Sequence, residues 1–339
     1  MLKKYIYDGS QKFKIAKVSN DETSLCPERA EAEKKMAENL KKISELQDRL
    51  YADKREGVIF VFQAMDAAGK DGTIRAVLSC LSPHGVYEAA FKSPTSNELA
   101  HDYLWRINQQ IPAKGEIAIF NRSHYEDVLI GKVKSFYKTQ AHADRINLDK
   151  VIENRYEDIS NFEKYLYRNN VRTVKIFLNV SKDEQAERFL SRIEEPAKNW
   201  KFSSGDFEER KYWDAYQLAF EDAINETATK DCPWYVVPAD HKWYMRYVVS
   251  EIILSVLEDM NPQYPEVTQD RLNEFEQYRV ALVDELAISE KKDPEKAARR
   301  KAEKEKEKAE KAARKAAKKA KKEAKKAAKE EKEKAEKEK

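Results

Sequence analysis

The sequence has few of the residues that mark disulfide scaffolds, flexible linkers and membrane spans. Its 339 residues include only 3 cysteines, 8 glycines and 10 prolines. Cys26, Cys80 and Cys232 are far apart and form no CxxC pair, which argues against a disulfide framework and a zinc site. Glycine and proline are too sparse to mark an interdomain linker before Pro294. No segment approaches the roughly 18 apolar residues of a membrane span, so we expect a soluble cytoplasmic protein without a membrane partner.

Large apolar side chains are also missing from residues 291–339, which consist almost wholly of Lys, Ala, Glu and Arg. The tail has 23 basic and 12 acidic residues and the rest has 41 and 49, so a basic tail follows a mildly acidic body. The body therefore offers no broad basic face for nucleic acid, and a polyanion site must come from local clusters of cations. The tail itself could form a solvated helix, stay disordered or hold anionic partners loosely.

Short apolar runs alternate with amphipathic segments along the rest of the chain. The runs predict buried strands over residues 57–62, 85–91, 116–120, 173–180 and 234–237. Apolar residues three and four apart predict helices over residues 30–51, 73–81, 97–108, 147–168, 182–192, 207–228, 241–257 and 272–286. Strands separated by helices of this length predict an α/β sandwich with a central parallel sheet.

This alternation is continuous enough to indicate one catalytic domain. We place it at residues 53–265, after an N-terminal helical extension at residues 1–52. A C-terminal helix at residues 266–290 and the charged low-complexity tail at residues 291–339 follow.

A loop of small residues, Ala64 to Thr73, follows the first buried strand and opens a helix, which is the context of a phosphate-binding loop. Its backbone N–H groups can cradle phosphate while Lys70 supplies a cation. Ala64 replaces the first glycine of the general pattern, and Asp71 replaces the hydroxyl residue that normally holds Mg²⁺, so we assign the metal to Asp66. The predicted phosphate contacts are Ala67, Ala68, Gly69, Lys70, Asp71, Gly72 and Arg75. A plain turn between strand and helix is the alternative.

A polar cluster, NRSHYED, follows the strand at residues 116–120, at the sheet edge where α/β proteins bind ligands. Asn121 stands where P-loop enzymes usually have an Asp. Arg122 could neutralise the transferred group, and Glu126 or Asp127 could hold a metal water or orient the acceptor. The two acids are equally suited to the acidic first turn of an ordinary helix.

A third group of charges surrounds the helix break at residues 195–205 and predicts a mobile lid. Arg188 and Arg192 are four apart on one helical face and could both reach phosphates, while lid lysines could close over a charged substrate. Surface cations paired with neighbouring glutamates are the alternative. The cluster comprises Arg188, Arg192, Lys198, Lys201, Arg210 and Lys211.

Four ordered motifs, AMDAAGKDGTIR, FNRSHYEDVL, RFLSRIEEPAKNWKFS and PADHKWYMRYVV, resemble the polyphosphate kinase 2 family, and the second resembles its class III members. The resemblance spans about residues 53–259. It implies a thymidylate-kinase-like P-loop fold and transfer of a phosphoryl group from inorganic polyphosphate to AMP and ADP. It also implies Mg²⁺ or Mn²⁺ as cofactor and a homo-oligomer, a dimer or a tetramer. The tail lies outside the resemblance.

Carried over to this chain, the resemblance assigns catalytic roles to residues of all three clusters. The implied catalytic residues are Asp66, Lys70, Asn121, Arg122, Glu126, Asp127 and Arg188. The lid cations that match the family are Arg188, Lys198 and Lys201. With Arg122, and with Arg192 from the helical spacing, they are the predicted polyphosphate contacts, and Asp66 and Asp127 are the predicted metal contacts. Direct in-line transfer needs no covalent intermediate on the enzyme. Two alternatives stay open: an ATP-dependent nucleoside or nucleotide kinase of the same fold, and a non-catalytic scaffold whose working part is the tail.

Overall fold

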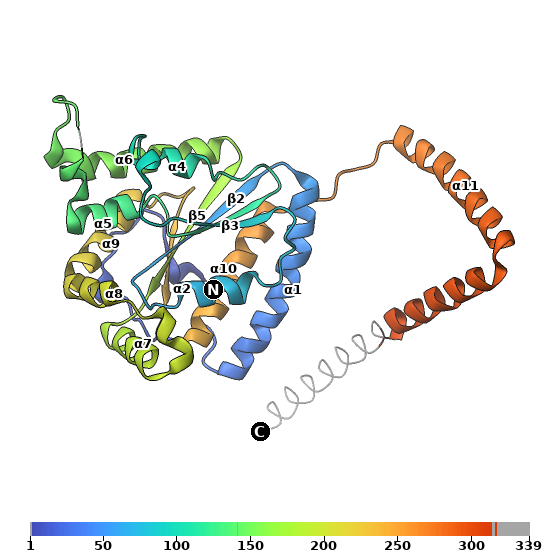
Figure 1. Ribbon diagram of the computed structural model, residues 1–339, viewed down its shortest axis with the longest axis horizontal. Helices are drawn as coiled ribbons and strands as arrows, with labels where there is room; N and C mark the ends of the chain where they lie inside the picture. Colours follow the sequence, from blue (N-terminus) through green and yellow to red (C-terminus); the bar gives the residue numbers. More distant parts are fainter. Residues whose placement is uncertain (1, 141, 314–315, 317–339) are drawn as a thin grey trace, which may run out of the picture. The chain divides into compact units, whose positions relative to one another are not determined.

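The computed structural model describes residues 2–140, 142–313 and 316 as an α/β body followed by a separate helical segment (Figure 1). The body, Met1–Pro265, and the part of the chain that begins at Glu266 are two compact units. The body contains the sheet, both helical layers and every predicted catalytic residue. In the described residues, no helix combines the length and the apolar character that crossing a membrane requires.

The body is built on a six-stranded sheet, in the order β1-β6-β5-β2-β4-β3. Five strands are parallel. The apolar runs of the sequence account for the burial of β2, β4, β5 and β6 on both faces, whereas the edge strand β3 is only partly buried. The strands are β1 (Ile6–Tyr7), β2 (Gly57–Ala64), β3 (Val86–Ala90), β4 (Ile117–Asn121), β5 (Val171–Asn179) and β6 (Trp234–Pro238). The predicted α/β fold with a central parallel sheet is confirmed.

The chain reverses its direction of sheet growth at β2, which lies between β4 and β5. After β2 the chain adds β4 and β3 on one side, and then returns to add β5 and β6 on the other. Phe62 pairs with Asn121 of β4 in this register, so the ends of β2 and β4 lie side by side. The carboxyl edge at such a reversal is where α/β sheets bind ligands.

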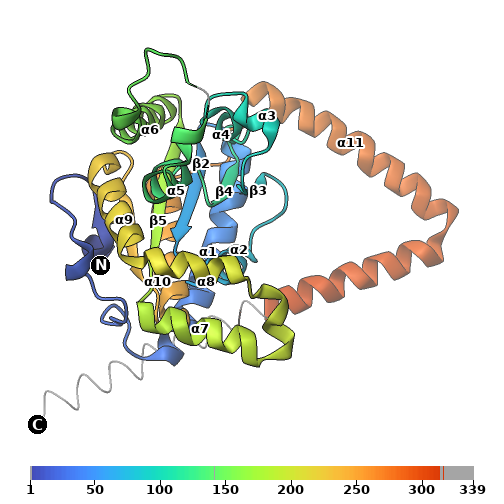
Figure 2. The ribbon, with the colours of Figure 1, turned by 60° about the vertical axis from the view of Figure 1, so that its left-hand side comes forward.

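Helices cover both faces of the sheet (Figure 2). One layer packs α1 (Arg29–Asp53), α2 (Lys70–Leu78) and α10 (Lys242–Met260) together, and the other packs α5 (Glu126–Lys134), α6 (Val151–Arg168) and α9 (Trp213–Thr227). The amphipathic patterns explain this placement, because each helix buries its apolar stripe against the strands or against a neighbouring helix. In α10, for example, Tyr244, Val248 and Ile252 are fully buried.

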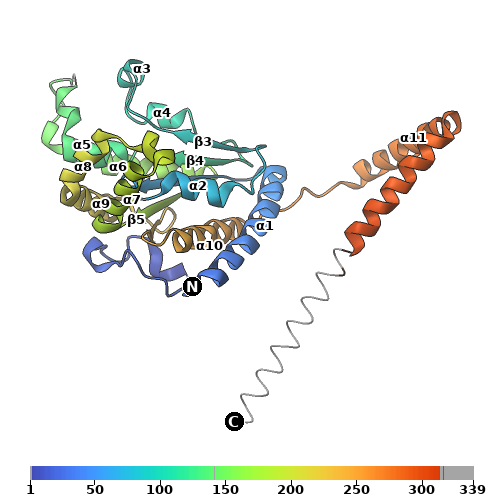
Figure 3. The same cartoon turned by 60° about the horizontal axis from the view of Figure 1, so that its bottom comes forward.

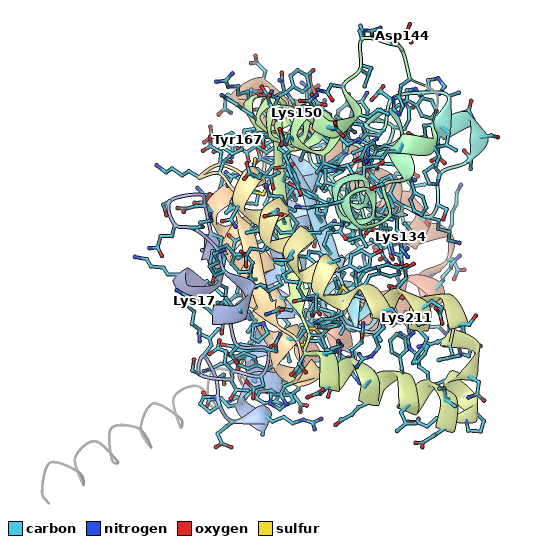
Figure 4. The ribbon with its side chains drawn as sticks, turned by 90° about the vertical axis from the view of Figure 1, so that its left-hand side faces the viewer. Lys17, Lys134, Asp144, Lys150, Tyr167 and Lys211 are labelled. Carbon is cyan, nitrogen blue, oxygen red and sulfur yellow. The ribbon has the colours of Figure 1, made fainter. Side chains whose placement is uncertain are left out.

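A lid segment, Lys182–Glu209, follows β5 at the carboxyl edge of the sheet. It consists of α7 (Lys182–Glu194), the 3-10 helix η5 (Pro196–Lys201) and α8 (Ser204–Glu209). The lid is tied to α5, because Lys134 Nζ lies 3.2 Å from Glu209 Oε1 and 3.6 Å from the centre of the Tyr212 ring. Figure 4 labels Lys134 and Lys211 on the face where these elements meet.

Two predicted helices are shorter than their apolar patterns suggested. Residues 97–108 form α3 (Ser96–Leu99) and α4 (Trp105–Asn108), because a capping box at Thr95 and Glu98 starts a single turn and Asp102 accepts from the Leu104 N–H in the turn between them. Residues 207–228 divide at the 3-10 turn Arg210–Tyr212. The edge strand β1, which pairs antiparallel with β6, was not predicted, since two residues carry no readable alternation.

Beyond the body, the predicted helix at residues 272–286 is present as α11 (Gln269–Lys292), which extends past it at both ends. Figure 3 labels α11 in orange. None of its residues is buried, although it carries large apolar side chains such as Leu272, Phe275 and Leu282. Residues 294–313 are also helical. The remainder of the predicted low-complexity tail, apart from residue 316, lies outside the described residues.

Candidate active site

The phosphate-binding loop joins β2 to α2 through two residues in the left-handed region. Ala67 has φ 60° and Gly69 has φ 98°. Such a conformation is free of strain for glycine and costs roughly 1–3 kcal/mol for alanine, so the surrounding contacts must hold Ala67 in place. The N–H of Thr73 bonds to the Gly69 carbonyl, which leaves the earlier N–H groups of α2, at Lys70, Asp71 and Gly72, without helical partners. Such N–H groups at the start of a helix are suited to bind an anion, as the sequence predicted for this loop.

Lys70 reaches across the sheet edge to the end of β4. Its Nζ donates to Asn121 Oδ1 and lies 3.6 Å from Asp71 Oδ1. The Asn121 amide uses its other end as well, because Nδ2 donates to Asp71 Oδ1 at 3.0 Å and to Glu88 Oε1 at 2.7 Å. Burial lowers the pKa of Lys70, the charge of Asp71 opposing this effect. The structure therefore brings Lys70, Asp71 and Asn121 together, and adds Glu88, which sequence reasoning missed.

Arg122 lies beside the loop acid. It adopts a left-handed φ of 64°, and its Nη2 donates to Asp66 Oδ1 at 3.1 Å. Its backbone N–H donates to the Phe62 carbonyl at 3.2 Å, which ties the end of β4 to the end of β2. The Asp66 backbone is fixed in turn by Gln185 of the lid, whose Nε2 donates to the Asp66 carbonyl at 2.8 Å. Gln185 was also missed.

Glu126 and Asp127 point to different surroundings, because successive residues of a helix do not share a face. Burial raises the pKa of Glu126, whereas the neighbouring charge of Arg122 lowers it, and Asp66 also acts on it. Asp127 instead lies between Arg155 and Arg106, at 3.8 and 3.9 Å. Glu126 is therefore the one of the two acids that shares the surroundings of Asp66.

A third acid, Asp206 of the lid, lies close enough to Asp66 and Arg122 for their charges to affect its pKa. Burial raises the pKa of Asp206, and the charges that act on it include those of Asp66, Arg192 and Arg122. Its Oδ2 accepts from Arg192 Nη1 at 3.4 Å. No motif pointed to Asp206, and its proximity depends on how the lid folds back over the sheet edge.

Arg188 is buried beneath the phosphate-binding loop and is 7% exposed. Its guanidinium donates to four backbone carbonyls: Ala67 at 3.1 Å, Ala68 at 2.5 Å, Ala239 at 2.7 Å and Asp240 at 3.0 Å. Its Nε donates to Glu184 at 2.6 Å. All of its donors are thus engaged by protein groups. The predicted role of a lid cation that projects toward phosphates does not match this placement, because the side chain braces the loop from below.

The other predicted cations are nearer the surface. Arg192 donates to the Lys201 carbonyl at 3.2 Å as well as to Asp206, and Lys198 Nζ lies 2.5 Å from Glu195. Lys201 lies over the Trp200 ring at 5.1 Å. Arg75 is exposed on α2. Surface pairing with glutamate, the alternative that the sequence left open, applies to Lys198.

The donor set of the predicted metal pair can be compared with what magnesium requires. The described residues contain no group of three His, Cys, Asp or Glu side chains placed to enclose a metal ion. Magnesium proteins commonly supply one or two carboxylates and leave the other positions to waters and substrate phosphates. Asp66 with Glu126 fits that requirement, whereas Asp127 is occupied by two arginines.

His124, in the middle of the polar cluster, is not available for chemistry. It is 2% exposed, and its Nε2 lies 3.6 Å from Glu163 Oε1. Glu163 also accepts from Lys175 Nζ at 2.5 Å and from the Tyr125 hydroxyl at 2.8 Å. This buried network anchors the loop that carries Asn121 and Arg122. A phosphorylated histidine is not compatible with such burial.

Comparison with known proteins assigns the chain to a family. The model of the family described as Polyphosphate kinase 2 matches residues 27–265. The chain is 48% identical over 246 residues to the ADP-polyphosphate phosphotransferase of Rhodopseudomonas palustris, covering 72% of this chain and 85% of that protein. It is 44% identical over 266 residues to the AMP/ADP-polyphosphate phosphotransferase of Meiothermus ruber, covering 78% and 96%.

The fold agrees with that of a solved relative. The crystal structure of Polyphosphate Kinase 2 from Arthrobacter aurescens TC1 superposes with a TM-score of 0.74 at 36% sequence identity, covering 83% of this chain and 96% of that one. The matched sequence includes the phosphate-binding loop, the polar cluster after β4 and the lid. The chain therefore belongs to the polyphosphate kinase 2 family.

Proposed function

We propose that this protein is a polyphosphate-dependent nucleotide kinase, which transfers a phosphoryl group from inorganic polyphosphate to AMP and ADP. The observation that carries the proposal is the convergence of Lys70, Asn121, Arg122 and Asp66 at the carboxyl edge of β2 and β4. Family membership supports it, as do the names of the relatives, which act on ADP or on AMP and ADP.

The transfer is a direct displacement. An oxygen of the acceptor phosphate attacks the terminal phosphorus of polyphosphate, the bond from that phosphorus to the bridging oxygen breaks, and the shortened chain leaves with the electron pair. Lys70 and Arg122 neutralise the oxygens of the transferred group, and the N–H groups at the start of α2 hold the neighbouring phosphate. Asn121 holds the Lys70 ammonium group at the end of β4.

Mg²⁺ or Mn²⁺, when bound, would supply positive charge that offsets the charge of the phosphates. We propose that Asp66 and Glu126 hold it, in place of the Asp66 and Asp127 pair that the sequence suggested. Arg122, which contacts Asp66 at 3.1 Å, would then exchange that contact for the phosphate. Asp127, between Arg106 and Arg155, would position α5.

The donor decides between this proposal and its alternative. Full-length protein with ADP or AMP, Mg²⁺ and polyphosphate, and with no ATP added, is expected to form ATP from ADP and ADP from AMP. Chromatography of the nucleotides measures this directly. Transfer from ATP to a nucleotide without any reaction of polyphosphate would establish the ATP-dependent kinase instead.

The predicted dimer or tetramer is a separate proposal. Light scattering of the purified protein would measure its oligomeric state.

Activity is expected to fall on acidification at a higher pH than an ordinary glutamate would cause, because burial raises the pKa of Glu126. A raised pKa means that the carboxylate is lost as the pH decreases through that value, and the metal site is lost with it. Measuring kcat/KM between about pH 4.5 and 8 should show this acidic limb, since free glutamate titrates near 4.3. Glu126→Gln should lower activity and remove the limb. Asp127→Asn is the matched control, and removal of the limb by Asp127→Asn alone would reverse the assignment.

A further inference from the structure

Two cations on α10 lie next to the phosphate-binding loop and take no part in the site described above. Lys242 and Arg246 are four residues apart, so they lie on the same face of the helix. α10 begins directly after β6, at the same edge of the sheet as the loop. A Cβ atom at Gly72 would lie 3.4 Å from Arg246 Nη2, and one at Gly69 would lie 3.3 Å from Met245 Cε. The first turns of α10 therefore pack against the loop and the start of α2.

Neither cation forms a salt bridge with an acid in the described part of the chain, although the charges of Glu184 and Glu195 act on Lys242. Arg246 Nε is shielded from solvent and has no hydrogen-bond partner there. Burial lowers the pKa of Lys242, and the positive charges of Arg188, Lys198 and Arg246 lower it further. Glu184 opposes them, but its carboxylate is paired with Arg188 at 2.6 Å. The buried Arg246 Nε without a partner and the like charges around Lys242 are unfavourable, and a bound polyanion would supply the missing acceptor and counter-charge.

The order of the strands shows on which side of the phosphate-binding loop Lys242 and Arg246 lie. β3 and β4, which carry Glu88 and Asn121, lie on one side of β2, whereas β6 and the start of α10 lie on the other. A linear anion held at the start of α2 therefore has an uncompensated basic surface on the α10 side. On the opposite side it meets Glu88 and Asp71, whose charges would repel an extended polyphosphate.

We propose that Lys242 and Arg246 bind the internal phosphates of the donor, so that polyphosphate runs from the loop across Gly72 and along the first turns of α10. The acceptor nucleotide then approaches from the β3 and β4 side. This inference rests on the proposed function and specifies where its donor lies. It assigns the two cations to holding the chain behind the transferred phosphate, and not to the transfer itself.

The test compares donors of different length. kcat/KM is measured for long-chain polyphosphate and for tripolyphosphate, at saturating ADP, in Lys242→Met, Arg246→Met and the double variant. The ratio of long-chain to tripolyphosphate kcat/KM is expected to fall roughly tenfold in the double variant, because a short donor ends near the loop and loses fewer contacts. Lys164→Met is the matched control, since Lys164 is exposed on α6, in the other helical layer.

Two measurements separate the possible outcomes. Lys242 is exposed, so Lys242→Met should fold normally and still test the inference if a change at Arg246 impairs folding. Arg246→Lys retains the charge and should keep most of the preference for long donors. Binding of fluorescently labelled long-chain polyphosphate without nucleotide should weaken in the Met variants and not in Lys164→Met. An unchanged ratio and unchanged binding in an active enzyme would overturn the inference, whereas a wild-type protein that cannot use polyphosphate would overturn the proposed function.

Discussion

Lys70→Ala is expected to lower kcat by about 10³-fold, the size of effect seen when a preorganised donor to transition-state charge is removed. Lys70 contacts Asn121 and lies near Asp71, so its charge is held where the transferred phosphoryl group must pass. The Lys70 side chain is only 15% exposed, so little water surrounds it, and this burial lowers its pKa. Loss of the side chain removes a cation that solvent cannot replace. The initial rate of ATP formation from ADP and polyphosphate measures the effect.

The control for Lys70→Ala is a measurement of its stability, which excludes unfolding as the cause of lost activity. Because Lys70 is not a residue of the hydrophobic core, thermal unfolding of Lys70→Ala should stay close to that of the wild type. Lys70→Arg tests geometry, since the charge is kept and the planar head is too wide to occupy the same position. Retention of full activity by Lys70→Ala would remove the phosphate-binding loop from the mechanism.

Arg188→Met is expected to reduce the free energy of unfolding by about 3–5 kcal/mol, the usual cost of breaking a buried charged network. The substitution leaves Glu184 without its partner, and it leaves the carbonyls of Ala67, Ala68 and Ala239 without these donors. Chemical denaturation measures the change. Activity should fall at every donor concentration, because the loop loses the support that holds Ala67 in its left-handed conformation.

The matched control is Arg192→Met, one helical turn further along α7. Arg192 is a partly exposed lid residue that contacts the Lys201 carbonyl and Asp206. Its loss should change stability by less than about 1 kcal/mol, as is usual for accessible ion pairs. If Arg188→Met folded as well as the wild type and only raised the KM for polyphosphate, the lid role that the sequence suggested for Arg188 would be correct after all.

The sheet and its ligand-binding edge were predictable from local sequence patterns. The strand that ends at Ala64 and the strand that ends at Asn121 are continuous apolar runs, so the sheet and its ligand-binding edge were readable. The convergence of Lys70 with Asn121 followed from that edge. Local patterns of this kind depend on neighbours in sequence, and those are visible without a structure.

The missed features depend on distant parts of the chain. Arg188 and Arg192 look equivalent in sequence, and only the packing of α7 under the loop distinguishes the brace from the lid cation. Glu126 and Asp127 are adjacent in sequence and separated in surroundings by one helical step. Asp206 reaches the site through the fold of the lid. No periodicity encodes contacts between residues so far apart.

The hydrogen bonds of the Asn121 amide couple the choice of residue at position 121 to that at position 71. Its two ends accept from Lys70 and donate to Asp71 and Glu88, a task for which only a neutral group with both functions is suited. An aspartate at position 121, as in the general P-loop pattern, would place three carboxylates together. The two departures from that pattern, Asp71 and Asn121, are therefore complementary, because the amide at the strand end binds the acid in the loop. Either change alone would be unfavourable, so we expect positions 71 and 121 to have changed together.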